Sequence, residues 1–405
     1  MRGAIRAGQV IISADEPPVP GGVVSWEGDR ITAVGGVDAL PEAFDPAAFD
    51  IVLDLPELTV MPGLIDSHGH ITTNTVKGTS LQDQARADVA LAVLAGVENL
   101  REDLHAGVTT MRVVGDPVGL DIKFRRAIER GQIPGPSLQT SARAFRPSHG
   151  TAAFLAVAVD GEEALRRHIR ENFFLGADWI KLFVSNVMHG DTYVDYLQGD
   201  LTGVPAYSRA EIAAAIDEAH TLGMKVVVHA IGGPAMRWSI ELGVDSVEHA
   251  NLMEDGDVDL FVEHGTTLSD PNLQLFYDDE TGFATKPNWS GNEWWQAKVK
   301  DAAERTARYL PEALRRGVNI CLAVDSNHSF LWKELVHFVA LGASETEALL
   351  AVTRNPARLL GLEREAGALR VGMRADIVAV EGDPLRDIAA VRSIRHVVAR
   401  GWQIL

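Results

Sequence analysis

Residues 61–70 read Met61-Pro62-Gly63-Leu64-Ile65-Asp66-Ser67-His68-Gly69-His70, an apolar run that ends in two histidines with one residue between them. In a strand, side chains two residues apart point to the same side, so both imidazoles can reach one metal ion from the end of this strand. A His-x-His pair alone is a weak signal, because two solvated histidines in a polar loop give the same pattern. The interpretation therefore depends on the rest of the chain.

Short apolar runs alternate with segments of helical spacing beyond this point, which is typical of βαβ units with a parallel sheet. Helical spacing is clear over residues 86–105, 161–175, 208–222, 254–264 and 297–316. Eight such units predict a (β/α)8 TIM-type barrel. A doubly wound open sheet favours a glycine-rich loop after its first strand, and residues 66–70 are not one. The strand candidates lie near residues 63–69, 107–115, 136–144, 178–185, 225–231, 246–250, 266–270 and 319–325.

Four further strand candidates carry a residue of metal-ligand type at or near the carboxyl end. Lys181 belongs to the fourth, His229 ends the fifth, His249 ends the sixth and Asp325 ends the eighth. Barrel active sites lie at this end of the strands, and a buried polar side chain is costly there unless it is paired or bound to a metal. Together with the first strand, these residues predict a metal centre.

Both chain ends differ from this pattern. Residues 1–60 and 365–405 contain short β-type runs separated by proline and glycine clusters. We expect these two ends to form one small β-sandwich domain, with the barrel over residues 61–364.

The composition excludes several classes of partner. The net charge of −19 repels nucleic acid and anionic membrane surfaces, and no stretch approaches the about 20 apolar residues of a membrane span. Cys321 is the only cysteine, which fits a reducing compartment, and the first residues lack the apolar run of a signal peptide. We expect a cytoplasmic protein that acts on a small-molecule substrate.

The order His-x-His, Lys, His, His and Asp on strands one, four, five, six and eight resembles the amidohydrolase superfamily. The segments MPGLIDSHGH at 61–70 and GALRVGMRADIVAV at 367–380 strengthen the resemblance. The segments GADWIKLFVS at 176–185, VVVHAIG at 226–232 and SVEHAN at 246–251 look most like the branch with prolidase-like dipeptidases, ochratoxin-type amidases and imidazolonepropionase-like proteins. The eighth strand usually ends Gly-Thr-Asp in this superfamily, whereas here it ends Ala323-Val324-Asp325.

The resemblance implies two divalent metal ions. His68, His70 and Asp325 would hold one, His229 and His249 the other, and Lys181, carboxylated by carbon dioxide, would bridge both. A barrel lysine paired with a carboxylate is the alternative for Lys181. Zinc is the expected metal, although manganese, iron, nickel and cobalt share such sites. Asp325 would carry the proton from the attacking water to the leaving group.

Further residues are candidates for substrate contacts. His149 follows the third strand, and the resemblance implies a contact with the substrate carbonyl; a surface-loop histidine is the alternative. Arg143 and Arg146 are candidate anchors for a substrate carboxylate, unless they form surface salt bridges. Tyr277 and Trp294 belong to an aromatic-rich loop that is expected to cover the site or line an apolar pocket. Packing at a subunit interface, or sealing of the barrel, is the other interpretation of these aromatic residues, which are Phe276, Tyr277, Phe283, Trp289, Trp294 and Trp295 of the loop, together with Trp332.

These features favour a metal-dependent amidohydrolase in which a metal-bridging hydroxide attacks an amide-type C–N bond. The substrate would be an N-acyl amino acid, a dipeptide, or an aromatic amide or carbamate. A deaminase, a cyclic amidase resembling imidazolonepropionase, a lactonase and a phosphotriesterase are the alternatives. Deaminases of the superfamily mostly use one metal and lack the strand-four lysine. A non-catalytic binding protein fits least, because every ligand position is filled. We expect a homo-oligomer.

Overall fold

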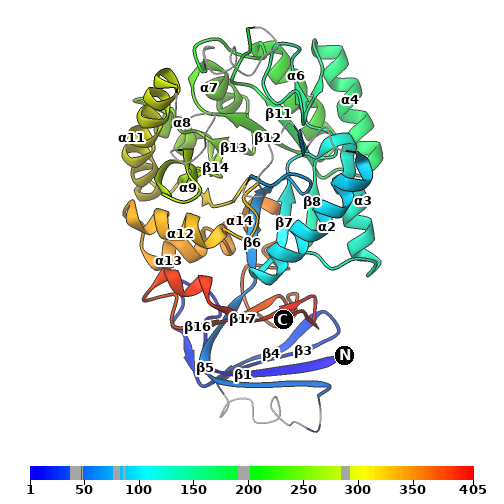
Figure 1. Ribbon diagram of the computed structural model, residues 1–405, viewed down its shortest axis with the longest axis vertical. Coiled ribbons are helices and arrows are strands. Elements are labelled where there is room, and N and C mark those ends of the chain that lie inside the picture. The colour runs from blue at the N-terminus through cyan, green and yellow to red at the C-terminus, as the bar shows by residue number, and fades with distance from the viewer. Residues whose placement is uncertain (37–46, 48, 76–82, 85–87, 190–200, 284–291) are drawn as a thin grey trace.

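The structure is a computed structural model that describes all residues except 37–46, 48, 76–82, 85–87, 190–200 and 284–291. Within the described residues, the chain forms one strand at each of the eight predicted positions, and these strands run through the centre of the upper part of the molecule (Figure 1). The predicted fold class, a TIM-type barrel, is confirmed. The eight strands are β6 (Leu64–Gly69), β7 (Val108–Val113), β8 (Ser137–Thr140), β11 (Trp179–Phe183), β12 (Lys225–Ala230), β13 (Ser246–His249), β14 (Thr267–Ser269) and β15 (Ile320–Cys321).

Helices surround these strands (Figure 1). The five helical segments expected from spacing correspond to α2 (Val89–His105), α4 (Glu162–Leu175), α6 (Arg209–Thr221), α8 (Asp257–His264) and α11 (Glu293–Arg315). Helix α6 starts with a capping box between Ser208 and Glu211, and α4 ends at Gly176 in the left-handed conformation, so local sequence signals set these boundaries. Among the described residues, the remaining α-helices are α3 (Leu120–Glu129), α7 (Gly233–Glu241), α9 (Leu273–Tyr277), α12 (Leu331–Ala340), α13 (Glu345–Leu350) and α14 (Arg354–Leu360).

The barrel strands form two parallel sheets that meet at two seams. One sheet has the order β6-β7-β8, and the other runs from β11 to β15 with the short strands β9 (Phe145–Arg146) and β10 (Val157–Ala158) at its edge. At one seam the Asp178 N–H donates to the Thr140 carbonyl over 2.8 Å. At the other, Gly69 and Asp325 form a parallel bridge, with the Asp325 N–H donating to the His68 carbonyl over 3.0 Å. The eighth strand therefore lies beside the first.

Strands from both chain ends share one eight-stranded sheet, which lies below the barrel in Figure 1. In this sheet β5 lies between β1 and β16, and β5 continues almost directly into the first barrel strand, β6. The Gly63 N–H donates to the Asp376 carbonyl over 2.9 Å, which ties that junction to the C-terminal part of the chain. The strands are β1 (Arg2–Val10), β2 (Val19–Pro20), β3 (Gly22–Glu27), β4 (Arg30–Gly36), β5 (Ile51–Pro62), β16 (Ile377–Glu381), β17 (Ile394–Ala399) and β18 (Trp402–Gln403).

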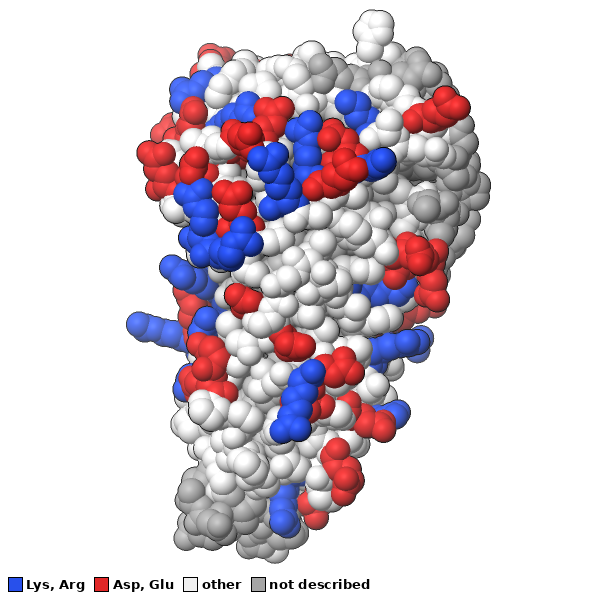
Figure 2. Space-filling view, turned by 90° about the vertical axis from the view of Figure 1, so that its left-hand side faces the viewer, with Lys and Arg blue, Asp and Glu red and all other residues white. Residues whose placement is uncertain are grey.

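The outer surface of the barrel carries closely interleaved charges. Figure 2 shows Lys and Arg beside Asp and Glu over the upper part of the face that carries α8 and α11. Arg308 pairs with Asp255 at 2.7 Å, and Arg237 pairs with Asp257 at 2.6 Å. Among the described helices, none has both the length and the apolar character needed to cross a membrane.

Candidate active site

The carboxyl ends of the barrel strands bring the predicted ligands together. The Nε2 atoms of His68 and His70 lie 3.4 Å apart, and the Nε2 atom of His70 lies 3.6 Å from Oδ1 of Asp325. The ring of His249 lies 5.2 Å from that of His68 and 4.7 Å from that of His229, between centroids. Two ligands of a tetrahedral zinc ion, each about 2.1 Å from the metal, are separated by about 3.4 Å. The first three side chains therefore fit a bound metal ion.

In each of these imidazoles, one ring nitrogen contacts a neighbouring polar group, which leaves the other ring nitrogen for a metal. His70 Nδ1 lies 2.6 Å from the Gly115 carbonyl, and His68 Nδ1 lies 2.7 Å from Oε2 of Glu248. His229 Nε2 lies 3.1 Å from the side-chain oxygen of Asn186. Such outer partners fix the tautomer and orientation of metal-binding histidines.

One ring nitrogen of His249 is likewise in contact with a neighbouring polar side chain, that of Asn272. The Asn272 amide nitrogen lies 2.7 Å from His249 Nδ1, while the Asn272 amide oxygen is buried without a hydrogen bond. Exchanging the amide nitrogen and oxygen, which have nearly the same shape, lets the oxygen accept the Nδ1 proton and removes the unpaired atom. The Nε2 atom of His249 is then available to a metal.

A buried arginine anchors the carboxylate behind His68. Arg112 donates to Oε1 of Glu248 over 2.8 Å and to the Ser246 hydroxyl over 2.8 Å, and its guanidinium carbon lies 4.5 Å from the Trp179 ring centre. Both charged side chains are completely buried. Sequence analysis missed this pair. A signal for Glu248 was present, because a glutamate directly before His249 in a short strand is a charged residue at a position expected to be buried.

Lys181 reaches the same centre from β11 and is completely buried. Among the described residues, its amine has no hydrogen-bond partner, and no carboxylate lies within ion-pair distance of it. Burial lowers the pKa of Lys181 to about 8. The amine is therefore neutral in an appreciable fraction of molecules near neutral pH.

The carboxylate of Asp270, at the end of β14, also belongs to the centre and was missed by sequence analysis. Ligand atoms of His68, His249, Asp270 and Asp325 all lie within 4.8 Å of one another, which is close enough to hold one metal ion. The available signal was its position, directly after an apolar strand, as for Asp325. His249, Asp270 and Asp325 have φ angles of 77°, 48° and 57°. Non-glycine residues rarely adopt this conformation, and they cluster at functional sites.

The electrostatic environment favours the metal-binding form of these side chains. Burial, with a contribution from Lys181, lowers the pKa of His68 to about 3 and that of His249 to about 4, so both rings are neutral at pH 7. Burial alone would raise the pKa of Asp325, but the imidazoles of His68, His70 and His249 and the amine of Lys181 outweigh burial and hold this pKa below its usual range. Asp325 is therefore ionised.

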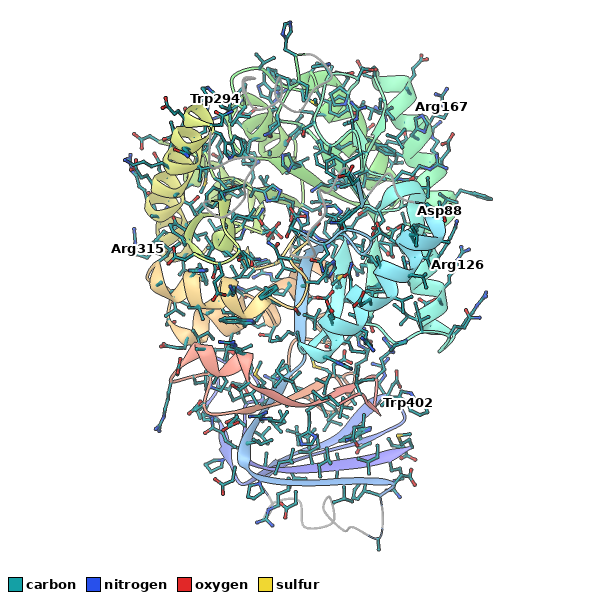
Figure 3. All side chains as sticks on the ribbon, viewed as in Figure 1. Asp88, Arg126, Arg167, Trp294, Arg315 and Trp402 are labelled. Carbon is teal, nitrogen blue, oxygen red and sulfur yellow. The ribbon has the colours of Figure 1, made fainter. Side chains whose placement is uncertain are left out.

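The other predicted substrate contacts lie in different surroundings. His149 is exposed, but its loop joins the segment after β11, since its carbonyl accepts the Met188 N–H over 2.7 Å. Arg146 donates to carbonyls of its own loop, including that of Ser148 at 3.0 Å. Arg143 pairs with Glu171 at 3.3 Å and lines a groove of about 420 Å³. Arg167, another residue of this groove, lies on the outer side of α4 in Figure 3.

The aromatic residues after β14 fall into two groups. The Tyr277 hydroxyl donates to the Ala303 carbonyl of α11, and its ring packs against the barrel core. Trp294, labelled in Figure 3 at the start of α11, belongs to a second cluster. That cluster includes Ile231 and Leu252, which follow the strand-end histidines His229 and His249 by two and three residues. Its described members include Ile231, Leu252, Phe276, Phe283, Trp294 and Trp295. Trp289 lies outside the described residues.

The sequence model of the Amidohydrolase family matches residues 59–403. The chain belongs to the amidohydrolase family. It is a hydrolytic enzyme that acts on carbon–nitrogen bonds, as expected, and the buried His and Asp cluster fits the divalent metals that the family generally uses.

Relatives of this amidohydrolase fall in the expected branches. Ochratoxinase of Aspergillus niger is 25% identical over 373 residues, which cover 84% of this chain and 74% of that protein. Imidazolonepropionase of Paracoccus denitrificans is 25% identical over 424 residues, which cover 95% of this chain and 90% of that protein. The solved structure of a prolidase complexed with N-methylphosphonate-L-proline superimposes with a TM-score of 0.83 at 25% identity, over 100% of this chain and 99% of that one.

A buried ion pair supports the His70 segment from behind. His328 Nδ1 lies 2.6 Å from Oδ2 of Asp103 in α2, and its Nε2 lies 2.9 Å from the Thr73 carbonyl. Both nitrogens face acceptors, so the doubly protonated ring satisfies both contacts. Burial opposes the charge, but the Asp103 carboxylate outweighs it and raises the pKa of His328 to about 9.

This pair predicts how stability depends on pH. A folded-state pKa above the unfolded value of 6.5 gives stability that is fully present below pH 6.5 and is lost as pH rises through about 9. At about 1.4 kcal/mol per pKa unit, the loss is on the order of 3 kcal/mol. We expect the free energy of unfolding, measured by denaturant titration between pH 6 and 10, to show this decline. His328→Asn should lack it, and an equal decline in that variant would contradict the assignment.

Proposed function

We propose that this enzyme is a metal-dependent hydrolase that cleaves the C–N bond of a small amide, such as an N-acyl amino acid, a dipeptide or an aromatic amide. The observation that carries the proposal is the meeting of His68, His70 and Asp325 at ligand-like separations of 3.4 and 3.6 Å. The similarity to a prolidase structure and to an ochratoxinase supports an amide substrate.

Two divalent ions, with zinc as the first candidate, are part of this proposal. His68, His70 and Asp325 would hold one ion, and His229 and His249 the other, with carboxylated Lys181 shared between them. The metal supplies a lowered pKa for water and polarises a carbonyl. The chain supplies neutral imidazoles whose outer nitrogens are already held by Gly115, Glu248, Asn186 and Asn272.

Asp325 is the proposed proton carrier. Its carboxylate is ionised, and its side chain remains 31% exposed, whereas His68 is almost completely buried. The Ser326 hydroxyl donates to its Oδ1 over 3.2 Å, which orients the group at the open end of the strands. Asp325 would accept a proton from the attacking water and donate it to the leaving nitrogen.

Lys181 is proposed to be carboxylated. The neutral amine attacks carbon dioxide, a C–N bond forms, and one proton is released, which leaves a carbamate anion. The absence of a hydrogen-bond partner for this buried amine among the described residues supports the modification, because the carbamate would be held by the cations beside it.

The substrate is proposed to carry an apolar or aromatic group. The cluster that contains Trp294, Trp295 and Phe276 borders the ends of β12 and β13 and offers such a surface. His149 is proposed to contact the substrate carbonyl, because its loop joins the segment that follows Lys181. Arg143 is proposed as a carboxylate anchor, a role in which a substrate carboxylate would replace Glu171 as its partner.

The protein is further proposed to be a cytoplasmic homo-oligomer. The Phe174 side chain on α4 is 90% exposed and its neighbour Phe173 is 48% exposed, which is unusual for two adjacent aromatic residues on a solvent-facing helix. A second copy of the chain would cover this surface.

The function is tested by a hydrolysis screen. Metal-loaded enzyme should hydrolyse members of a panel of N-acyl amino acids, dipeptides and aryl amides, with release of both the acid and the amine. Chelated enzyme should lose most turnover and regain it with zinc, cobalt or manganese. Release of ammonia without a second organic product would instead identify a deaminase.

Asp325→Asn should lower kcat by about 10²- to 10⁴-fold, because the amide cannot carry the proton. The variant should retain most bound metal by elemental analysis. Ser326→Ala is the matched control, because it removes only the hydroxyl that donates to Asp325, and it should lose much less. A rate for Asp325→Asn near that of the wild type would show that the proton carrier is another group.

Native mass spectrometry tests the carbamate. The metal-loaded protein should carry the extra mass of one carbon dioxide, which acid denaturation removes, and Lys181→Met should lack it. Lys225→Met is the control, because Lys225 lies at the opposite end of a neighbouring strand and bonds the Leu359 carbonyl. Recovery of carboxylation after decarboxylation should be faster above pH 8, where the amine is mostly neutral. A metal-bound protein with an unmodified amine would contradict the proposal.

Light scattering after size exclusion tests the association of subunits. The wild type should have a mass above that of one chain, and Phe174→Glu should shift the equilibrium towards monomer. Val371→Glu is the control, since Val371 is 66% exposed but lies next to the terminal sheet. A wild-type monomer at micromolar concentration would contradict the proposal.

A further inference from the structure

Asp270 is a buried carboxylate without a hydrogen-bond donor. It follows β14, its side chain is completely inaccessible, and neither carboxylate oxygen has a hydrogen-bond partner among the described residues. Burying an ionised carboxylate without compensation costs several kcal/mol, so such a group is paired, protonated or bound to a cation. The surroundings of Asp270 distinguish these possibilities.

Two imidazoles lie close to Asp270, but their protons are already engaged. Oδ2 of Asp270 lies 3.1 Å from Nδ1 of His68 and 3.4 Å from Nδ1 of His249. The single proton on His68 Nδ1 points to Glu248, which is nearer at 2.7 Å. The Nδ1 atom of His249 already contacts Asn272 and the Asp270 carbonyl. Neither ring has a second hydrogen at this nitrogen while it is neutral.

The other charged groups nearby do not satisfy Asp270. Arg112 is bonded to Glu248, and Asp325 adds a further negative charge beside the same histidines. Carboxylate oxygens of Asp270 and Asp325 and ring nitrogens of His68 and His249 lie within 4.8 Å of one another. Two carboxylates this close repel each other unless a cation lies between them or one of them is protonated, and these are the two states that the experiment below distinguishes.

We propose that Asp270 is an additional ligand of the metal centre, contributed by the seventh barrel strand, where its carboxylate lies beside His68 and Asp325 of one proposed ion and His249 of the other. This inference rests on the metal centre proposed above. The ligands predicted from the sequence lie on strands one, four, five, six and eight. Asp270 would add an anionic oxygen ligand from the seventh strand. Such a ligand lowers the net positive charge of the centre and favours divalent ions that accept mixed nitrogen and oxygen ligands.

Asp270→Asn tests the proposal, because it removes the charge and keeps the shape. Zinc affinity, measured by calorimetry on chelated protein in the presence of bicarbonate, should fall about 10- to 100-fold. The absorption spectrum of the cobalt-loaded variant should change, because a ligand oxygen is lost. The metal-free variant should melt at or above the temperature of the metal-free wild type, while zinc should raise its melting temperature less.

Glu334→Gln is the matched control. Glu334 is a buried carboxylate on α12 that accepts the N–H groups of Leu273 and Gln274 over 2.9 and 2.8 Å, so it supports the same segment without joining the cluster. Its zinc affinity should stay within about threefold of the wild type, even if its melting temperature falls.

The outcomes separate the two proposals. If Asp270→Asn binds zinc within about threefold of the wild type and gives the same cobalt spectrum, Asp270 is a neutral acid and the inference is overturned, while the metal-dependent function stands. If the wild type binds neither zinc, cobalt nor manganese, both proposals fail. If Asp270→Asn melts lower without metal and binds zinc normally, its role is structural and the inference is overturned.

Discussion

The meeting of the first and eighth strands at Gly69 and Asp325 is the contact on which the rest of the site depends. The Asp325 N–H donates to the His68 carbonyl over 3.0 Å, and the His70 N–H donates to the Asp325 carbonyl over 3.2 Å. These two backbone bonds fix the relative positions of residues that are more than 250 positions apart in the sequence. The side chains of His68, His70 and Asp325 then share a volume small enough for one cation, because their backbones have no freedom to separate.

Below this contact, a buried hydrogen-bond network of charged side chains lies inside the barrel. Arg112 stacks on Trp179 and bonds Glu248, and Glu248 in turn holds His68. A buried ion pair is weak evidence for stability, because desolvation offsets the attraction. Its effect here is geometric: the carboxylate accepts the Nδ1 proton of His68 and leaves Nε2 facing His70. The pair orients the His68 ring at little net gain in folding energy.

The sequence predicted those parts of the site that depend on local pattern. His68, His70, His229, His249 and Asp325 were found because each ends or follows an apolar run, and parallel strands place such ends together. Lys181 was found in the same way, but its carboxylation remains a prediction. Helices α7 and α3 were missed, since Gly233-Pro234 and Pro117 read locally as turns and the packing of α7 against β12 comes from the fold.

Long-range contacts account for what sequence could not predict. Arg112 lies on the second strand and bonds the sixth, so no spacing relates it to Glu248, and the partners of Arg143 and Tyr277 come from helices α4 and α11. The segment that was expected to be one aromatic-rich loop shows the same limit, because Tyr277 ends helix α9, Trp294 begins helix α11, and the two side chains pack in different clusters.

Asp270 and Asp325 also differ in a way that their local sequence does not predict. The sequence position of Asp270 resembles that of Asp325, since each follows a short buried strand, but Asp325 keeps access to solvent and Asp270 does not. Their solvent exposure determines which chemistry each can perform. A carboxylate that reaches solvent can exchange protons with water and substrate, whereas a fully enclosed one interacts only with the groups around it. This difference fits the two roles proposed above, proton transfer for Asp325 and cation binding for Asp270, although the same strand-end geometry positions both.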